Sequence, residues 1–307
     1  MSLARTVLLR ASRSTWLAEQ FRRRKFARRA VRRFMPGEDV ASALDAAASF
    51  AGAGIGSIVT ALGERVGTRA EAEAVRRHYI EVLDAIHARG LPSHISVKLT
   101  HLGLDVDRAF CADAVLTLAE HAAVTGTMLW IDMEESQYVD ATLDIYRRVH
   151  AERSRVGVCL QAYLRRTPAD LESLLAAGGC VRLVKGAYRE PPSLAFPKKS
   201  DTDAAFFGLG VRMLAAATPE RLQVFGTHDV ALLNRLRTHA HSERVAREAW
   251  EVHMLYGIRT AEQRTLVAGG VGMRVLISYG THWFPWYVRR LAERPANVWF
   301  VLRSVLS

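Results

Sequence analysis

The chain has 307 residues, of which 50% are hydrophobic and 24% are charged. This composition is typical of a globular protein that buries a substantial core. No apolar run reaches the roughly 18 residues that a membrane-spanning helix requires. The three cysteines (Cys111, Cys159 and Cys180) are odd in number and lack metal-ligand spacing, so we expect a reduced protein in the cytoplasm.

The net charge of +11 is concentrated at the amino terminus. Residues 1–33 contain eleven arginines and lysines and one acid, Glu19, so the remaining residues carry a net charge of only +1. We interpret residues 1–33 as a basic helical arm and residues 34–307 as the catalytic domain. Three interpretations of the arm stay open: packing on the domain, peripheral contact with the anionic inner face of a membrane, or an organellar transit peptide. Nucleic acid is not an expected partner, because the rest of the chain has no second basic patch.

Beyond residue 35, short β-rich runs alternate with stretches of helical periodicity, which is typical of repeated βα units. Most of the β-rich runs are continuously apolar, as expected for parallel strands covered on both faces. The predicted strands are residues 56–62, 94–99, 128–133, 156–162, 181–186, 222–227, 250–255 and 273–278. A helix is predicted over residues 167–177, where Thr-Pro-Ala-Asp opens an apolar repeat. Eight such units predict an α/β fold, a single TIM-like (βα)8 barrel.

Polar side chains stand at the ends of five successive predicted strands, where this fold places its catalytic groups. Lys98 interrupts the apolar run of the second strand, and Asp132 interrupts that of the third. Because buried charges are rarely left unpaired, each is expected to form a structural ion pair or to face a ligand. The next three strand ends carry Gln161, Arg182 with Lys185, and Thr227 with His228. Five polar ends in succession favour a ligand site.

Two further acids, Glu134 and Glu135, follow Asp132 directly. A cluster of acids could bind a metal, but no matching acid or histidine follows at the next strand ends. We therefore interpret Glu134 and Glu135 as solvated residues of the barrel rim and expect no metal site.

Two adjacent arginines, Arg289 and Arg290, follow the last predicted strand. Neighbouring residues on a helix point about 100° apart, so an exposed basic turn is one interpretation. The other is that both arginines point into the barrel mouth. There they would bind a carboxylate through fork-shaped hydrogen bonds, which lysine cannot reproduce.

Together these residues resemble the proline dehydrogenase family. The most specific segments are Val-Arg-Leu-Val-Lys-Gly-Ala-Tyr at residues 181–188 and Arg289-Arg290-x-x-Glu293. Residues 96–99, 131–134, 161–163, 227–228 and 254–257 match in the expected order. The resemblance covers about residues 30–305 and is strongest to the short monofunctional bacterial members.

The resemblance implies a distorted (βα)8 barrel that binds FAD without a covalent link. It also implies oxidation of L-proline to 1-pyrroline-5-carboxylate by hydride transfer, with electrons passing to a membrane quinone. Arg289 and Arg290 would bind the substrate carboxylate, and Lys98 and Asp132 would complete the charged lining. Tyr188 and Leu255 would form the wall around the ring. The implied cofactor contacts come from Gln161, Arg182, Val184, Lys185, Gly186, Thr227, His228 and Glu293.

Leu276 departs from the family, which usually has a tyrosine at this place near the edge of the substrate ring. Tyr279 is offset by three residues, so its side chain is expected to point to the other face of the strand. The departure leaves a flavin dehydrogenase for a modified cyclic amino acid, such as a substituted proline, as an alternative. A catalytically silent barrel that acts as a scaffold is a third hypothesis, against which the convergence of four charged residues argues.

Overall fold

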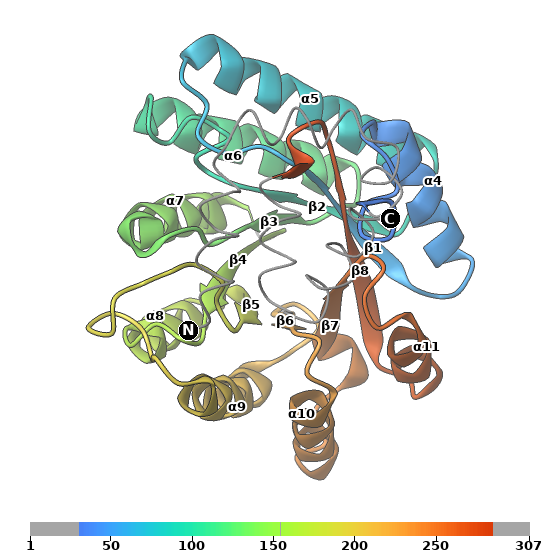
Figure 1. The fold of residues 1–307 in the computed structure, drawn as a ribbon, viewed down its shortest axis with the longest axis vertical. Helices are drawn as coiled ribbons and strands as arrows, with labels where there is room; N and C mark the ends of the chain where they lie inside the picture. Colours follow the sequence, from blue (N-terminus) through green and yellow to red (C-terminus); the bar gives the residue numbers. More distant parts are fainter. Residues whose placement is uncertain (1–30, 154, 285–307) are drawn as a thin grey trace, which may run out of the picture.

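The computed structural model describes residues 31–153 and 155–284, which form a closed barrel of eight parallel strands surrounded by helices (Figure 1). The strands pair in chain order, and β8 closes the barrel against β1. They are β1 (Gly56–Ala61), β2 (Ser93–Val97), β3 (Leu129–Ile131), β4 (Val156–Gln161), β5 (Cys180–Val184), β6 (Gln223–Gly226), β7 (Trp250–Leu255) and β8 (Gly272–Tyr279). The predicted fold is confirmed, and all eight predicted strands are present.

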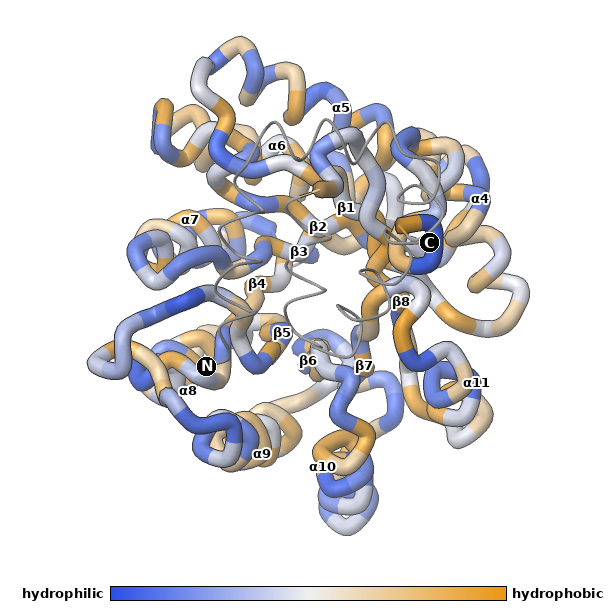
Figure 2. Tube along the Cα trace, in the orientation of Figure 1, coloured by the Kyte–Doolittle hydropathy of each residue, from blue (hydrophilic) through white to orange (hydrophobic). Residues whose placement is uncertain are grey.

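A helix follows each of the first seven strands, and α4 precedes β1. The helices are α4 (Val40–Ala51), α5 (Arg69–Ala88), α6 (Arg108–Val124), α7 (Val139–Glu152), α8 (Thr167–Ala176), α9 (Lys199–Ala216), α10 (Val230–Ser242) and α11 (Thr260–Ala268). Short 3-10 helices cover Ser136–Tyr138 and Arg247–Ala249. The predicted helix at residues 167–177 is confirmed as α8. In Figure 2 the surrounding helices carry hydrophobic and hydrophilic residues side by side, as amphipathic helices do.

Two hydrophobic clusters hold the barrel together. The larger one lies between the strands and the surrounding helices and includes Leu129 and Ile131 of β3. Trp130 lies between these two residues in the sequence, and it points to the opposite face of the strand. There it packs in a smaller cluster inside the barrel with Ile58 and Val224. Alternate residues of each strand therefore face the interior. At the end of a strand, two residues that are two positions apart thus both point into the barrel.

Local capping interactions set where the helices begin. Before α5, the hydroxyl of Thr68 accepts a hydrogen bond from the Glu71 amide, and the Glu71 carboxylate accepts one from the Thr68 amide at 3.0 Å. Before α10, the Asp229 carboxylate accepts a hydrogen bond from the Leu232 amide. This last cap also holds the loop after β6 at the barrel mouth.

The predicted arm, residues 1–33, lies mostly outside the described residues. At its end Val31 is buried, as is Met35, whereas Arg32 and Arg33 are exposed. None of the helices that the structure describes combines the length and the hydropathy of a membrane span. Helical structure in the arm and its contact with a membrane stay predictions.

Candidate active site

Lys98, Asp132 and Arg182 meet at the mouth of the barrel, although 84 residues of chain separate the first from the last. Asp132 accepts a hydrogen bond from Lys98 Nζ at 3.0 Å and another from the Ser96 hydroxyl at 2.8 Å. Its Oδ1 also forms an ion pair with the guanidinium of Arg182. The structure thus confirms that Lys98 and Asp132 pair. Ser96 was missed in the sequence, although it lies two residues before Lys98 and so on the same face of β2.

The charges in this cluster stabilise one another. Burial by itself raises the pKa of Asp132, but Lys98 and Arg182 outweigh it and lower that pKa below its ordinary value. Burial also lowers the pKa of Lys98, but the Asp132 carboxylate, with Tyr188, outweighs it and raises that pKa. Asp132 and Lys98 are therefore both charged at neutral pH. Two cations share one carboxylate, so this cluster of three side chains carries a net positive charge.

Arg182 is buried, with 3% of its surface exposed, and an aromatic ring supports it. Its guanidinium carbon is 5.1 Å from the ring centroid of Trp130. Trp130 is itself fixed by a hydrogen bond from its indole nitrogen to His94 Nδ1 at 3.2 Å. One guanidinium nitrogen, Arg182 Nη1, has no hydrogen-bond partner among the described residues. A buried donor without a partner is costly, and it is suited to bind an acceptor on a ligand.

Glu134 is buried, so the prediction of a solvated rim residue is wrong. Only 3% of it is exposed, and its carboxylate accepts hydrogen bonds from the Thr100 amide at 3.0 Å and the Thr100 hydroxyl at 2.6 Å. The segment after β3 therefore lies against the loop after β2, where the Glu134 carboxylate accepts hydrogen bonds from both Thr100 donors. Glu135 does lie at the rim, where it pairs with Arg65 at 2.6 Å. Gln161 donates to the Glu134 carbonyl oxygen at 2.7 Å, which fixes its amide at the end of β4.

The residues after β5 and β6 hold one another in place. Lys185 Nζ lies between the carboxylates of Asp203 at 2.5 Å and Asp229 at 2.7 Å. His228 Nε2 accepts a hydrogen bond from the Leu255 amide at 2.9 Å, so a neutral ring carries its proton on Nδ1. These contacts place Lys185 and His228 at the mouth. Direct cofactor contacts from Lys185, His228 and the buried Thr227 stay predictions.

Gly186 forms a cradle beside Tyr163. Its φ of +108° is a conformation that favours glycine, and a Cβ atom there would lie 2.2 Å from the Tyr163 ring. The Tyr163 hydroxyl is buried without a partner among the described residues, and burial raises its pKa. Val184 lies close to Gly226 on the next strand, where a Cβ would be 2.9 Å from a Val184 methyl. Both glycines thus allow a neighbouring side chain to pack directly against the backbone at the mouth.

Comparisons with known proteins agree with this geometry. The family model described as proline dehydrogenase matches residues 43–303. The chain belongs to the proline dehydrogenase family. It is therefore an enzyme, an oxidoreductase of the flavin-dependent kind.

Similar curated proteins cover nearly the whole chain. Proline dehydrogenase 1 of Bacillus subtilis (strain 168) is 34% identical over 280 residues, which are 90% of this chain and 91% of that protein. Proline dehydrogenase of Deinococcus radiodurans is 33% identical over 295 residues, 94% of each chain. Among solved structures, proline utilization A from Bdellovibrio bacteriovorus has a TM-score of 0.79 at 23% identity. The match covers 86% of this chain and 32% of the chain from Bdellovibrio bacteriovorus. This chain therefore spans about a third of that protein, and the two share the barrel fold.

Leu276, the position that departs from the expected family pattern, faces the barrel interior. It packs against the interior cluster that contains Trp130 and Val224. Its register partner on β7 is Leu255, and both leucines are half-buried. The two side chains therefore lie side by side on neighbouring strands. Tyr188 lies after β5, near enough to Lys98 to contribute to its raised pKa.

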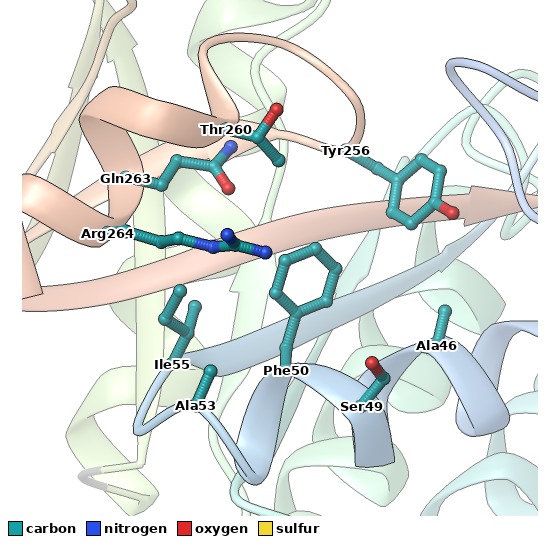
Figure 3. Close-up of a pocket in the computed structure, with 9 residues that line it drawn as sticks. All are labelled: Ala46, Ser49, Phe50, Ala53, Ile55, Tyr256, Thr260, Gln263 and Arg264. Carbon is teal, nitrogen blue, oxygen red and sulfur yellow. The ribbon is translucent and has the colours of Figure 1, made fainter.

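Neither nearby tyrosine fills the space beside Leu276. The Tyr279 hydroxyl is 2.6 Å from His78 Nε2 on α5, outside the barrel, which confirms its predicted orientation. Tyr256 packs edge-on against Phe50 of α4, with ring centroids 5.9 Å apart. Both rings line a cavity of about 200 Å³ between α4 and α11, outside the barrel (Figure 3).

The predicted carboxylate clamp, Arg289 and Arg290, lies outside the described residues, as does Glu293. Their roles stay predictions. The described part of the site therefore comprises the charged cluster, the cradle after β5 and the leucine pair.

Proposed function

We propose that this protein oxidises L-proline to 1-pyrroline-5-carboxylate with a non-covalently bound FAD. The observation that carries the proposal is the buried cluster of Lys98, Asp132 and Arg182 in a barrel of the proline dehydrogenase family. A catalytically silent scaffold would gain nothing from burying two cations and a carboxylate at the barrel mouth. Burying such charges is costly unless they serve a ligand or one another.

The described residues fit a flavin. Arg182 Nη1 is a buried donor without a partner, and the flavin ring edge carries oxygen and nitrogen acceptors. Gly186 lets the Tyr163 ring pack against the backbone, and the Tyr163 hydroxyl is a buried polar group without a partner among the described residues. The residues that would hold FAD are Gln161, Arg182, Val184, Lys185, Gly186, Thr227, His228 and Glu293. When bound, FAD supplies the hydride acceptor.

The chain's own residues would prepare proline for the reaction. Loss of a hydride from a ring carbon leaves a C=N bond, so the ring nitrogen must first release its proton to solvent. Lys98 and Arg182 together exceed the charge of Asp132. The remaining positive charge would disfavour the ammonium form of the proline nitrogen and so lower the pKa of that nitrogen. Arg289 and Arg290 would hold the carboxylate and fix the ring. Orientation of this kind can contribute several kcal/mol to lowering the barrier.

Electrons would pass from the enzyme to a membrane quinone. The basic arm, residues 1–33, supports this assignment because its eleven arginines and lysines suit an anionic surface. The protein would then be cytoplasmic, with peripheral contact at the inner face of the membrane. Leu276 favours a second candidate function, oxidation of a substituted proline, because it leaves apolar space at the ring edge.

An anaerobic titration tests the proposed function. Purified protein should be yellow. Because no electron acceptor is present, L-proline should reduce each flavin once and so bleach its absorbance. L-Valine, which has no ring nitrogen, serves as the control and should leave the absorbance unchanged. A colourless protein, or a flavin that no cyclic amino acid reduces, would leave only the scaffold hypothesis.

A further inference from the structure

A second cavity, of about 500 Å³, lies at the opposite end of the barrel from Lys98 and Asp132. Trp250, the first residue of β7, and Val271, just before β8, line it, so it lies at the amino-terminal ends of the strands. The cavity is large enough for a small organic molecule. A ligand bound there would not touch the reacting atoms.

The lining of this cavity is strongly basic. Its polar side chains include Arg237 and His241 of α10, and Arg244 and Arg247 from the connection to β7. No aspartate or glutamate lines it, and among the described residues none forms an ion pair with these three arginines. Arg166, by contrast, forms ion pairs with two carboxylates, those of Asp140 and Asp170.

The arginines exceed what the neighbouring helix ends need. Both α10 and α11 end beside the cavity, and basic residues commonly stabilise such carboxyl termini. Each terminus is equivalent to about half a negative charge, so the two together offset about one of the three guanidinium charges. A net positive charge remains on the lining, which suits an anion.

Two of the guanidinium groups converge on one backbone turn. A Cβ atom on Gly270, whose φ is +77°, would lie 2.5 Å from Arg247 Nη1. A Cβ atom on Gly269 would lie 3.6 Å from Arg237 Nη1. Adjacent residues thus hold the two side chains within reach of a single ligand. Arg244 adopts the left-handed conformation, with φ +56°, at the turn that ends α10, where its amide donates to the His241 carbonyl oxygen at 3.2 Å and the Val245 amide donates to that of Ala240 at 2.9 Å.

We propose that this cavity binds a phosphate group, carried by an organic part that packs against Trp250 and Val271. Guanidinium groups bind phosphate oxygens in pairs through fork-shaped hydrogen bonds, which lysine-based sites do not reproduce. The volume exceeds that of a phosphate group, and the apolar lining accommodates the remainder. The ligand is either a soluble phosphate ester or the headgroup of a lipid. The site is independent of the proposed function.

Calorimetric titration of the full chain with sodium pyrophosphate tests the site. The wild type should show saturable binding. The double variant Arg237→Gln/Arg247→Gln should bind at least about tenfold more weakly, because the loss of even one charge-assisted hydrogen bond raises the dissociation constant by about that factor. Arg244→Asn removes a third guanidinium while keeping a residue that tolerates positive φ, so it should weaken binding without unfolding. Arg212→Gln, which removes an exposed arginine of α9 outside the cavity, should bind as the wild type does.

Vesicle sedimentation distinguishes the two sources of phosphate. If the ligand is a lipid headgroup, the double variant should sediment less than the wild type with phosphatidic acid vesicles, and neither should sediment with phosphatidylcholine. If both proteins sediment equally while pyrophosphate binding differs, the ligand is a soluble phosphate ester. Because every variant retains residues 1–33, the arm contributes equally throughout. Pyrophosphate binding that is absent in the wild type, or equal in the double variant, would overturn the proposal.

Discussion

The guanidinium of Arg182 lies over the ring of Trp130, with 5.1 Å between its carbon and the ring centroid. Trp130 in turn donates a hydrogen bond to His94, and Arg182 holds Asp132 in its ion pair with Lys98. The order of the charged cluster at the mouth thus depends on an aromatic side chain one layer deeper in the barrel.

Replacing Trp130 should therefore affect catalysis without touching a charge. Trp130→Phe keeps an aromatic face under Arg182 and should retain most of the turnover rate. Trp130→Leu removes a cation–π contact, which contributes about 0.5–2 kcal/mol, so kcat should fall up to about thirtyfold. Steady-state kinetics and a thermal unfolding curve should be measured for both variants. Equal kcat values in two variants of equal stability would show that the ring only fills space.

Asp132 and Glu134 should give opposite dependences of stability on pH. The folded-state pKa of Asp132 is below 3.8, so its stabilising contribution is complete above that pH and is lost as pH falls through the folded value. The folded-state pKa of Glu134 is above 4.5, so the free energy of unfolding falls as pH rises from 4.5 through the folded value.

Urea denaturation between pH 3 and 7 can separate the two carboxyl groups. Asp132→Asn should flatten the acid limb of the wild-type profile and lower stability at neutral pH by about 3–5 kcal/mol, because it leaves buried cations without their partner. Glu134→Gln should instead reduce the fall in stability above pH 4.5. Matching profiles in the two variants would contradict the assigned directions.

Gly186→Ala should reduce flavin content. The added methyl group would lie 2.2 Å from the Tyr163 ring in a backbone conformation that alanine disfavours. Gly90→Ala is a matched control, because Gly90 also has a positive φ, +59°, but a methyl group there meets nothing within 4 Å. Flavin absorbance relative to protein should fall in the first variant and not in the second. Acid precipitation should release FAD into the supernatant in the wild type; flavin retained in the pellet would contradict a non-covalent link.

Leu276→Tyr should shift substrate preference towards proline. The variant places a flat ring and a hydroxyl in the barrel interior beside Leu255, where the wild type has an aliphatic side chain. The ratio of turnover for proline to turnover for alkyl-substituted or larger rings should therefore rise. Tyr279→Phe is the control, since this hydroxyl contacts His78 outside the barrel and should not change the ratio. An unchanged ratio in Leu276→Tyr would remove Leu276 from the substrate wall.

Arg289→Lys and Arg290→Lys should each weaken substrate capture more than flavin binding. Loss of a charge-assisted hydrogen bond costs about 1.5–3 kcal/mol, so kcat/KM should fall at least about tenfold. Flavin content, measured by absorbance, should stay close to that of the wild type. Unchanged kinetics in both variants would contradict the carboxylate clamp.

The sequence by itself determined the barrel and the chemical class of its mouth. Eight apolar runs spaced by helical stretches specify parallel strands, because side-chain hydropathy and its periodicity are local properties of the chain. Lys98 and Asp132 were identified because a charge inside an apolar strand is conspicuous without any knowledge of its partner. The alternation of side chains along a strand likewise gave the orientation of Tyr279, which the hydrogen bond to His78 confirms.

Only the tertiary structure decided which residues support those charges. Trp130 is a hydrophobic residue in a hydrophobic run, and its place under Arg182 depends on the register of three strands. Glu134 is an acid in an acidic segment, and it is buried because the Thr100 donors of another loop reach it. The arginine cavity similarly joins α10, the connection to β7 and the turn after α11. Such contacts depend on where the closed barrel brings distant segments together, which local periodicity does not encode.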